Sequence, residues 1–399
     1  MKQTTLSMAI KAALLGASVV IAPAALAADK ELLDILKANG AITEAQYTEL
    51  SMSNMMSKND RPSDALLKKM AWAGKIKIKG DLRLRQENNK GTAGKDGNKD
   101  RQRIRARIGV YADVADNVQA GVRLATGGST TSANTTLEDD FDMKDIFLDL
   151  AYINWQPLNG LEVIGGKFKQ PWEQVSGALI WDGDLNPEGL AFRYSTQLAG
   201  AQLIASAGHL VQGEDGNDTV SEDAKVTFGQ LAAKFKVAGA KTKLGVSIFD
   251  FDAEDGEDVT TGLGNSDDTK FNVSEVFAET NIDLGLPVKL YGQYVINNDA
   301  SGVNSGEDTA WLLGVGTKMG KWKASYDYRD TEANAVNSSF NDSDFAGGST
   351  DSKGSRWKLS YKINKNFSLA TTYLDTEIGT LGENKGDADT WQIDLVAKF

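Results

Sequence analysis

Hydrophobic and polar residues alternate along most of the chain from Gly74 to its last residue. In the stretch RQRIRARIGVY, residues 101–111, arginine occupies every second position from 101 to 107, and mostly apolar residues stand between. A period of two predicts a β-strand, because successive side chains of a strand point to opposite faces. Taken alone, such a strand fits an ordinary soluble sheet with one charged and one apolar face.

Sixteen segments of this kind follow one another, and short turns alternate with longer polar loops between them. A soluble sandwich has no reason to follow this rule, whereas outer-membrane barrels have an even strand number, short turns at one end and long loops at the other. A closed barrel also pairs every backbone group within lipid. The pattern therefore predicts an all-β fold, a 16-stranded antiparallel transmembrane β-barrel over residues 74–399. The predicted strands are 74–87, 101–114, 118–127, 144–156, 161–169, 188–196, 200–210, 224–237, 241–251, 270–282, 287–298, 309–318, 321–331, 354–363, 367–376 and 389–399.

The first 73 residues follow a different pattern. Residues 1–27 combine lysines, the apolar run 12–22 and the sequence Ala25-Leu26-Ala27, which predicts a secretory signal peptide. Residues 28–73 are expected to form a short helical segment in the periplasm. Thr43-Glu44-Ala45-Gln46 is a capping box that predicts the start of one of its helices.

Composition narrows the possible chemistry. The chain has no cysteine, which excludes a disulfide framework, a thiolate metal site and a cysteine nucleophile. After residue 27, no stretch has the 18 or so apolar residues that a membrane-spanning helix requires. Three long connections, 213–223, 252–268 and 341–354, are acidic and rich in glycine, and we expect them to face solvent.

Several stretches resemble a known family. The last strand, TWQIDLVAKF, ends in Phe399 and resembles the assembly signal of outer-membrane barrels. The stretches ELLDILKANGAITEAQYTEL, residues 31–50, and GGKFKQPWEQVSGALIWDGDLNPEGLAFRYS, residues 165–195, resemble those of the proteobacterial putative porin family, related to phosphate-selective porins O and P. The resemblance implies a sixteen-stranded barrel, commonly trimeric, that conducts small hydrophilic solutes.

The third long loop, residues 170–187, is unusually apolar and contains Trp172 and Trp181. In porins the third loop folds inward and narrows the lumen, so the resemblance implies the same here. Its apolar residues would then pack on the barrel wall. The carboxylates left for the constriction would be Glu173, Asp182, Asp184 and Glu188. The alternative is an extracellular cap with its own small hydrophobic cluster.

The predicted inner face carries a basic wall on neighbouring strands. Unpaired arginines would lower the barrier for anions, and carboxylates opposite them would set a field across the constriction. Alternatively, Asp81, Asp145, Asp149 and Glu162 neutralise the arginines in a rigid lattice. The acidic net charge of the chain, −12, favours cations instead. The predicted pore-lining residues are Arg83, Arg85, Arg101, Arg103, Arg105, Arg107 and Arg123.

Other chemistries find little support. His209 and Ser206 stand three residues apart on a predicted strand, so they would point to opposite faces and could not act as a hydrolytic pair. Asp250, Asp252 and Glu254 alternate as in a calcium loop but lack its glycine and glutamate positions. The arginine run has no interleaved aromatics and lies in an acidic chain, which argues against nucleic-acid binding. We therefore expect no enzyme activity, no cofactor and no metal site.

The sequence predicts an outer-membrane porin of a Gram-negative bacterium, a water-filled channel for small hydrophilic solutes with a preference for anions. The expected partners are outer-membrane lipid, lipopolysaccharide, the barrel assembly machinery and two further copies in a homotrimer. A non-conducting barrel that serves as an adhesin, receptor or structural anchor is the alternative.

Overall fold

The chain divides into two units on either side of Gly74. The computed structural model describes residues 34, 37–38, 43–48, 73–91, 98–138, 140–177, 179–213, 224–253, 263–379, 381 and 386–399. The predicted signal peptide and most of the predicted helical segment lie outside these residues and stay predictions. Within the described ranges, no helix is both long and apolar enough to cross a membrane.

In the first unit, the capping box forms as its sequence predicts. The Gln46 amide donates to Thr43 Oγ1 at 3.3 Å, and the Thr43 amide donates to Gln46 Oε1 at 2.9 Å. These reciprocal bonds satisfy two amides that the first turn of a helix leaves without a carbonyl partner. Residues 44–48 are helical, so the motif marks a real helix start.

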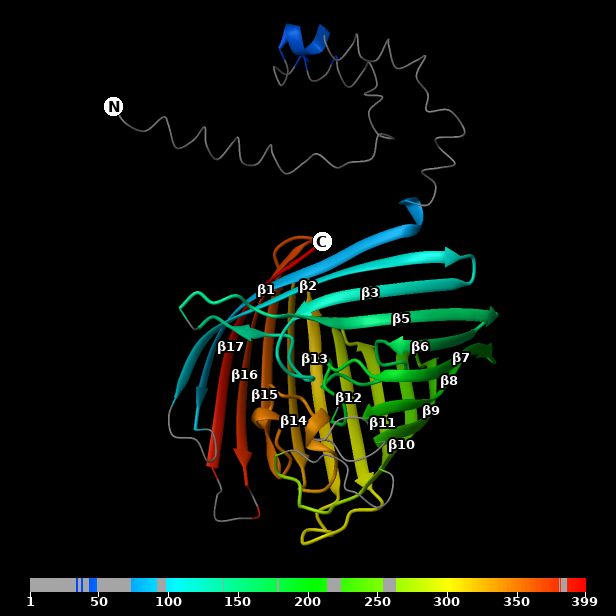
Figure 1. Ribbon diagram of the computed structural model, residues 1–399, viewed down its shortest axis with the longest axis vertical. Coiled ribbons are helices and arrows are strands. Elements are labelled where there is room, and N and C mark those ends of the chain that lie inside the picture. The colour runs from blue at the N-terminus through cyan, green and yellow to red at the C-terminus, as the bar shows by residue number, and fades with distance from the viewer. Residues whose placement is uncertain are drawn as a thin grey trace. The chain divides into compact units, whose positions relative to one another are not determined.

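The second unit is a closed antiparallel barrel (Figure 1), which confirms the predicted fold class. Seventeen strands belong to its sheet, but β4 (Thr135–Thr136) is a two-residue piece within a loop, so sixteen form the wall. These are β1 (Ile76–Lys90), β2 (Lys99–Ala115), β3 (Val118–Thr126), β5 (Ile146–Leu158), β6 (Leu161–Lys167), β7 (Glu188–Leu198), β8 (Ala201–Gly213), β9 (Ala224–Val237), β10 (Ala240–Ala253), β11 (Phe271–Asp283), β12 (Pro287–Asn297), β13 (Thr309–Met319), β14 (Trp322–Thr331), β15 (Ser352–Lys362), β16 (Phe367–Ile378) and β17 (Gly386–Lys398).

Short turns join the strands at one end of the barrel, here called the turn end, and longer connections join them at the loop end. The predicted alternation of the two is confirmed. Predicted strand ends differ from the observed ones by at most three residues. The prediction carried β6 on to residue 169, but the strand stops at Lys167 because the chain then leaves the wall.

The last residue closes the barrel. Strand β17 pairs with β1 along its length, and the pairing continues to Phe399, which exchanges two backbone hydrogen bonds with Gly80 at 3.0 and 3.1 Å. The C-terminus accordingly lies beside β1 in Figure 1. A Cβ on Gly80 would lie 2.5 Å from the Phe399 ring and 2.5 Å from the Arg107 carbonyl oxygen, so only glycine leaves room for the ring.

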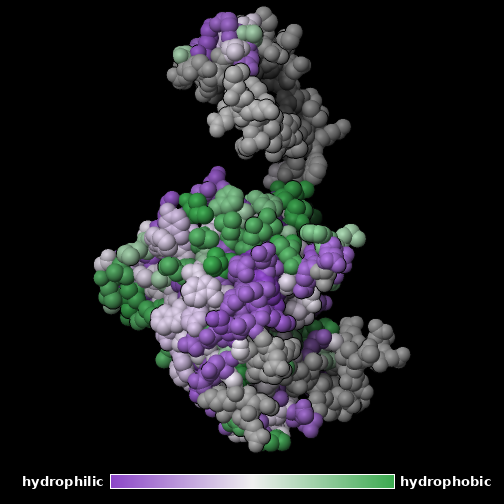
Figure 2. Space-filling model, turned by 90° about the vertical axis from the view of Figure 1, so that its left-hand side faces the viewer, coloured by the Kyte–Doolittle hydropathy of each residue, from purple (hydrophilic) through white to green (hydrophobic). Residues whose placement is uncertain are grey.

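The two faces of the wall differ in polarity as the alternation predicts. On β1, Leu82 and Leu84 point outward and are 43% and 49% exposed, whereas Asp81 and Arg85 point inward and are buried. Figure 2 shows hydrophobic residues gathered toward the turn end of one outer face and hydrophilic residues toward the loop end. An apolar outer face of this extent indicates a wall that faces lipid.

We predict that Gly80→Ala weakens closure of the barrel. The new Cβ would meet backbone as well as the Phe399 ring, and overpacking of this kind costs about 1–3 kcal/mol. The measurement is the temperature at which the folded barrel converts to the unfolded band in gel electrophoresis. Gly165→Ala is the control, because its Cβ would meet only Leu190 at 3.8 Å. Equal temperatures for the two variants would contradict the prediction.

Candidate functional site

The connection between β6 and β7, residues 168–187, turns into the barrel and is called the inner loop below. The Glu173 amide donates to Gln230 Oε1 at 2.7 Å, and Gln230 Nε2 donates back to the Glu173 carbonyl oxygen at 2.9 Å. The Leu179 amide donates to Gln293 Oε1 at 2.9 Å. Since Gln230 lies on β9 and Gln293 on β12, the loop crosses the inner face of these strands.

Apolar side chains of the inner loop pack against the same part of the wall. The rings of Trp172 and Trp181 lie 5.2 Å apart, and each lies within 5.4 Å of the Phe249 ring on β10. Leu179 and Ile180 are 0% and 2% exposed. Burial of side chains this large contributes about 1.5–3 kcal/mol each. The contacts match the inward path that the resemblance implies, and not an extracellular cap.

A polar row on the wall lies beneath the loop and helps to hold it. Gln230 donates to Ser247 at 3.0 Å, Ser247 donates to Glu275 at 2.5 Å, and Gln293 also donates to Glu275. The row crosses four neighbouring strands, β9 to β12, and its ends are the two glutamines that bind the loop backbone. Because every carboxylate and amide in the row has a partner, the row can lie buried beneath an apolar loop.

The predicted arginines of β2 lie on the inner face but are paired. Arg105 and Arg107 each lie 2.8 Å from Asp81 on β1. Asp184 of the inner loop lies 3.6 Å from Arg105 and 3.3 Å from Arg107. Asp184 therefore contacts the arginines directly instead of facing them across open space.

Glu87 on β1 forms ion pairs with three further arginines of this face. Its carboxylate lies 2.5 Å from Arg101, 3.4 Å from Arg85 and 3.6 Å from Arg103. Arg83 lies on the same inner face and forms no ion pair with another described residue. Asp81 and Glu87, together with Asp394 on β17 at 2.7 Å from Arg85, thus pair with five arginines.

The lattice alternative holds for two of its four carboxylates. Asp81 pairs as described, and Asp149 accepts a hydrogen bond from Arg123. Glu162 lies 3.5 Å from Arg193 instead. Asp145 is exposed and forms no ion pair within the described part of the chain. Most arginines of the inner wall are therefore paired with a carboxylate, but the carboxylates are only in part the predicted ones.

A second loop also enters the barrel, and the expectation that it faces solvent is wrong. In the connection 332–351, Phe345 is 1% exposed and Thr350 is fully buried. Asp344 lies 3.0 Å from Arg85 on β1, and Asp342 lies 3.2 Å from Arg356 on β15. The acidic composition suggested solvent, but the acids face wall arginines. The apolar Phe345 within the run was the signal for burial.

The two inward loops touch at Asp182. Its amide donates to the Phe340 carbonyl oxygen at 2.7 Å, and its carboxylate accepts from the Ser343 amide at 3.0 Å. The Phe340 ring stacks on Trp181 at 5.4 Å. Burial, together with the charge of nearby Asp342, raises the pKa of the Asp182 carboxyl to about 8. Asp182 therefore joins two loops and does not face an open constriction.

The other two predicted loop carboxylates lie apart. Glu173 meets three cations of the wall: Arg193 at 2.9 Å, Lys234 at 2.8 Å and Lys243 at 3.6 Å. Glu188 is the first residue of β7, is 59% exposed in its side chain and pairs with Lys167 at 2.6 Å. Glu188 thus belongs to the wall and not to the inner loop.

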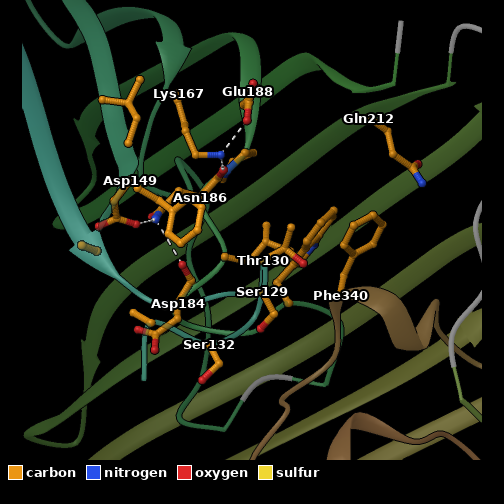
Figure 3. A pocket seen from close by; sticks show the side chains of 18 of the residues that line it. Ser129, Thr130, Ser132, Asp149, Lys167, Asp184, Asn186, Glu188, Gln212 and Phe340 are labelled. Carbon is orange, nitrogen blue, oxygen red and sulfur yellow. Dashed lines mark hydrogen bonds and ion pairs between the residues drawn. The ribbon is translucent and has the colours of Figure 1, made fainter. Parts of the chain in front are cut away.

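Cavities that charged and polar side chains border in part lie on both sides of the inner loop. Toward the loop end, a cavity of about 450 Å³ is bordered by Asp149, Asp184 and Asn186 (Figure 3). Asn186 donates to Asp149 at 2.6 Å there. Toward the turn end, a cavity of about 430 Å³ is bordered by Arg123 and Lys169. Because Asp149 borders one cavity and its partner Arg123 borders the other, this ion pair lies between the two cavities.

The remaining sequence candidates do not assemble into a site. Ser206 is 3% exposed and donates to the Pro171 carbonyl oxygen at 3.1 Å, whereas His209 is exposed on the outer face, as the predicted opposite orientation requires. Asp250 and Asp252 lie on β10, and Glu254 lies outside the described residues. Among the residues that the structure describes, no cluster of three potential metal ligands occurs.

Comparison with known proteins agrees with this architecture. The model of the family described as "putative porin" matches residues 90–283 and 289–399. The structure is similar to the high-pH structure of Pseudomonas putida OprB, with a TM-score of 0.58 and 10% identity over 83% of this chain and 96% of that one. It is also similar to the outer membrane channel DcaP of Acinetobacter baumannii, with a TM-score of 0.50 and 15% identity over 81% and 97%. No curated protein is detectably similar in sequence.

We predict that Trp181→Ala loosens the inner loop. Truncation removes ring contacts with Trp172, Phe249 and Phe340, and truncating a buried aromatic residue to alanine costs about 3–5 kcal/mol. Hydrogen exchange of peptides covering 170–185 should accelerate strongly. Trp357→Ala is the control, because Trp357 is 52% exposed on the outer face. Unchanged exchange in Trp181→Ala would show that the loop is held by other contacts.

We also predict that the contact between the two inward loops weakens as the pH rises. An isolated carboxyl ionises near pH 4, but the packed state holds Asp182 protonated up to about pH 8, so the contact loses stability between these values. Exchange of peptides covering 340–345, corrected for its intrinsic pH dependence, should be faster at pH 9 than at pH 6. Asp182→Asn should abolish the difference. Asp308→Asn, in the connection between β12 and β13 and outside this contact, should keep it. The same pH difference in Asp182→Asn would refute the assignment.

Proposed function

This chain belongs to the putative porin family, and we propose that it forms a water-filled channel for passive diffusion of small hydrophilic solutes across the outer membrane. The observation that carries the proposal is the pair of cavities on the two sides of the inner loop, each bordered in part by charged side chains, with the Arg123–Asp149 ion pair between them. Solutes would pass beside the loop at this point, where the wall is charged. The inner loop would set the width of the passage.

The outer surface supports an orientation in the membrane. Apolar side chains on the outer face would contact lipid, and in outer-membrane barrels the short turns lie on the periplasmic side. The turn end would accordingly face the periplasm and the loop end the exterior. Phe399, held at the β1 seam, would act as the signal for the assembly machinery. A homotrimer and contact with lipopolysaccharide complete the proposal on the basis of the resemblance.

We propose a modest preference for anions. On the inner face of β1 and β2, Arg83 forms no ion pair with any residue that the structure describes, and five further arginines share Asp81 and Glu87. Asp394 on β17 and the inward-loop carboxylates Asp184 and Asp344 reduce this excess. A small positive balance remains on this wall, and fixed charge of one sign lowers the barrier for ions of the other. Specificity for phosphate does not follow from these contacts.

Single-channel recording in planar bilayers tests the channel. A steady open current is expected, with the reversal potential in a KCl gradient on the anion side. No current from correctly folded protein would overturn the proposal. It would favour the alternative, a barrel that serves as an adhesin, receptor or anchor.

We predict that Arg103→Gln, Arg105→Gln and Arg107→Gln in combination shift selectivity toward cations. The substitutions leave Asp81, Glu87 and Asp184 short of partners. An unbalanced charge near the path changes the barrier by about 1 kcal/mol, or roughly fivefold in permeability ratio. The measurement is again the reversal potential, and Lys365→Gln, in the turn between β15 and β16, is the control. No shift would mean that these arginines do not face the path.

A further inference from the structure

A basic cavity lies on the turn-end side of the inner loop and is called the lysine cavity below. It encloses about 690 Å³ between β12, β13, β14, β15 and the tip of the inner loop. No acidic side chain among the described residues borders it. Its basic residues are Lys289, Lys318, Lys323, Arg356 and Lys358.

Two of the five cations are already engaged. Lys289 donates to Ser176 of the inner loop at 2.8 Å and lies 3.4 Å from Glu279. Arg356 binds Asp327 at 2.8 Å and Asp342 at 3.2 Å. These contacts place the loop tip as a roof over the cavity. The positive charge of the cavity that these contacts do not neutralise therefore belongs to the other three basic residues, which are all lysines.

Lys318, Lys323 and Lys358 form no hydrogen bond or ion pair with another residue in the described ranges, and all three are exposed to the cavity. The carboxylates of Asp344 and Asp394 attract Lys358 electrostatically but form no ion pair with it. Both carboxylates are bound by Arg85 instead. The inner-face arginines of β1 and β2 differ from these lysines, because among the described residues each of them except Arg83 forms an ion pair with a carboxylate.

The strand register brings these lysines together. Lys318 on β13 stands directly opposite Lys323 on β14. Lys358 on β15 stands opposite Ser325, two residues from Lys323, which makes the pair diagonal neighbours on one face. Directly opposite side chains have Cβ atoms roughly 4.5–5.5 Å apart, and like charges there repel. An anion between them would remove this repulsion.

From this arrangement we infer that the lysine cavity binds a small organic anion that carries two or three negative charges. Ammonium groups bind carboxylate or phosphate oxygen as point charges. The volume lies within the range of ligand pockets, about 300–1,000 Å³, and exceeds what an inorganic ion needs. The inference rests on the proposed channel, because it places the anion within the periplasmic part of the solute path.

Citrate block of the KCl current tests the site. Citrate carries three charges near neutral pH, and gluconate, of similar size, carries one. Citrate should reduce the current at concentrations where gluconate does not. In Lys318→Gln, Lys323→Gln, Lys358→Gln the concentration for half-block should rise by about tenfold or more, because three attractive charges are lost.

The matched control is Lys236→Gln with Lys241→Gln, a lysine pair that also stands directly opposite across two strands, β9 and β10, but does not border the cavity. The control should keep the block of the parent protein. Equal loss of citrate block in both variants would mean that block depends only on the overall positive charge of the interior, and would overturn the site. A current of the parent protein that citrate does not block would also overturn it.

Calorimetric titration of citrate into the folded protein in detergent separates this inference from the proposed channel. If no current flows, the channel proposal fails on its own. Citrate binding that the cavity variant loses and the control variant keeps would still support the site. Absence of citrate binding to the parent protein would overturn it.

Discussion

Closure of the hydrogen-bonded sheet is the constraint on which the rest of the structure depends. A wall that faces lipid has no solvent to pair its backbone, so every strand needs two neighbours and the first must meet the last. Here the seam extends to the final residue, where Phe399 pairs with Gly80 and its ring fills the space that a side chain there would take. Closure also commits one face of every strand to an enclosed interior.

That interior is divided between two kinds of packing. The inner face of β8 to β13 carries an apolar and aromatic cluster, with Phe249 and Phe277 almost fully buried, and this cluster packs against the inner loop. The inner faces of β1, β2, β14 and β15 are charged and meet the acidic residues of both inward loops. Apolar residues of the loops thus pack on the apolar part of the wall, and acidic residues of the loops pair with its charged part. Charged side chains border the cavities that the loops leave, as a path for hydrophilic solutes requires.

Alternation predicts the wall well because the polar and apolar positions within one strand show which of its side chains point inward and which point outward. It predicted strands to within three residues, and it placed the arginines of β2 on the inner side. It could not predict what lies across the interior. Strand β13 is apolar on both faces at Leu312 and Leu313. Leu312 packs in the interior with the inner loop and Leu313 faces outward, and a periodic pattern cannot show this. The connection 341–354 looked solvent-exposed because its partners, Arg85 and Arg356, are distant in sequence.

The same limit applies to charge. A run of arginines suggests a strong positive field, but a guanidinium has a planar fork of donors that can bind two carboxylates, and here Arg85 binds Asp344 and Asp394. Pairing of this kind cancels most of the field of the arginine face. Lysines that face one another with no acidic partner in the described part of the chain keep their field, as Lys318 and Lys323 do. The charge that a permeating solute meets therefore depends less on how many basic residues line the barrel than on which of them the loops leave unpaired.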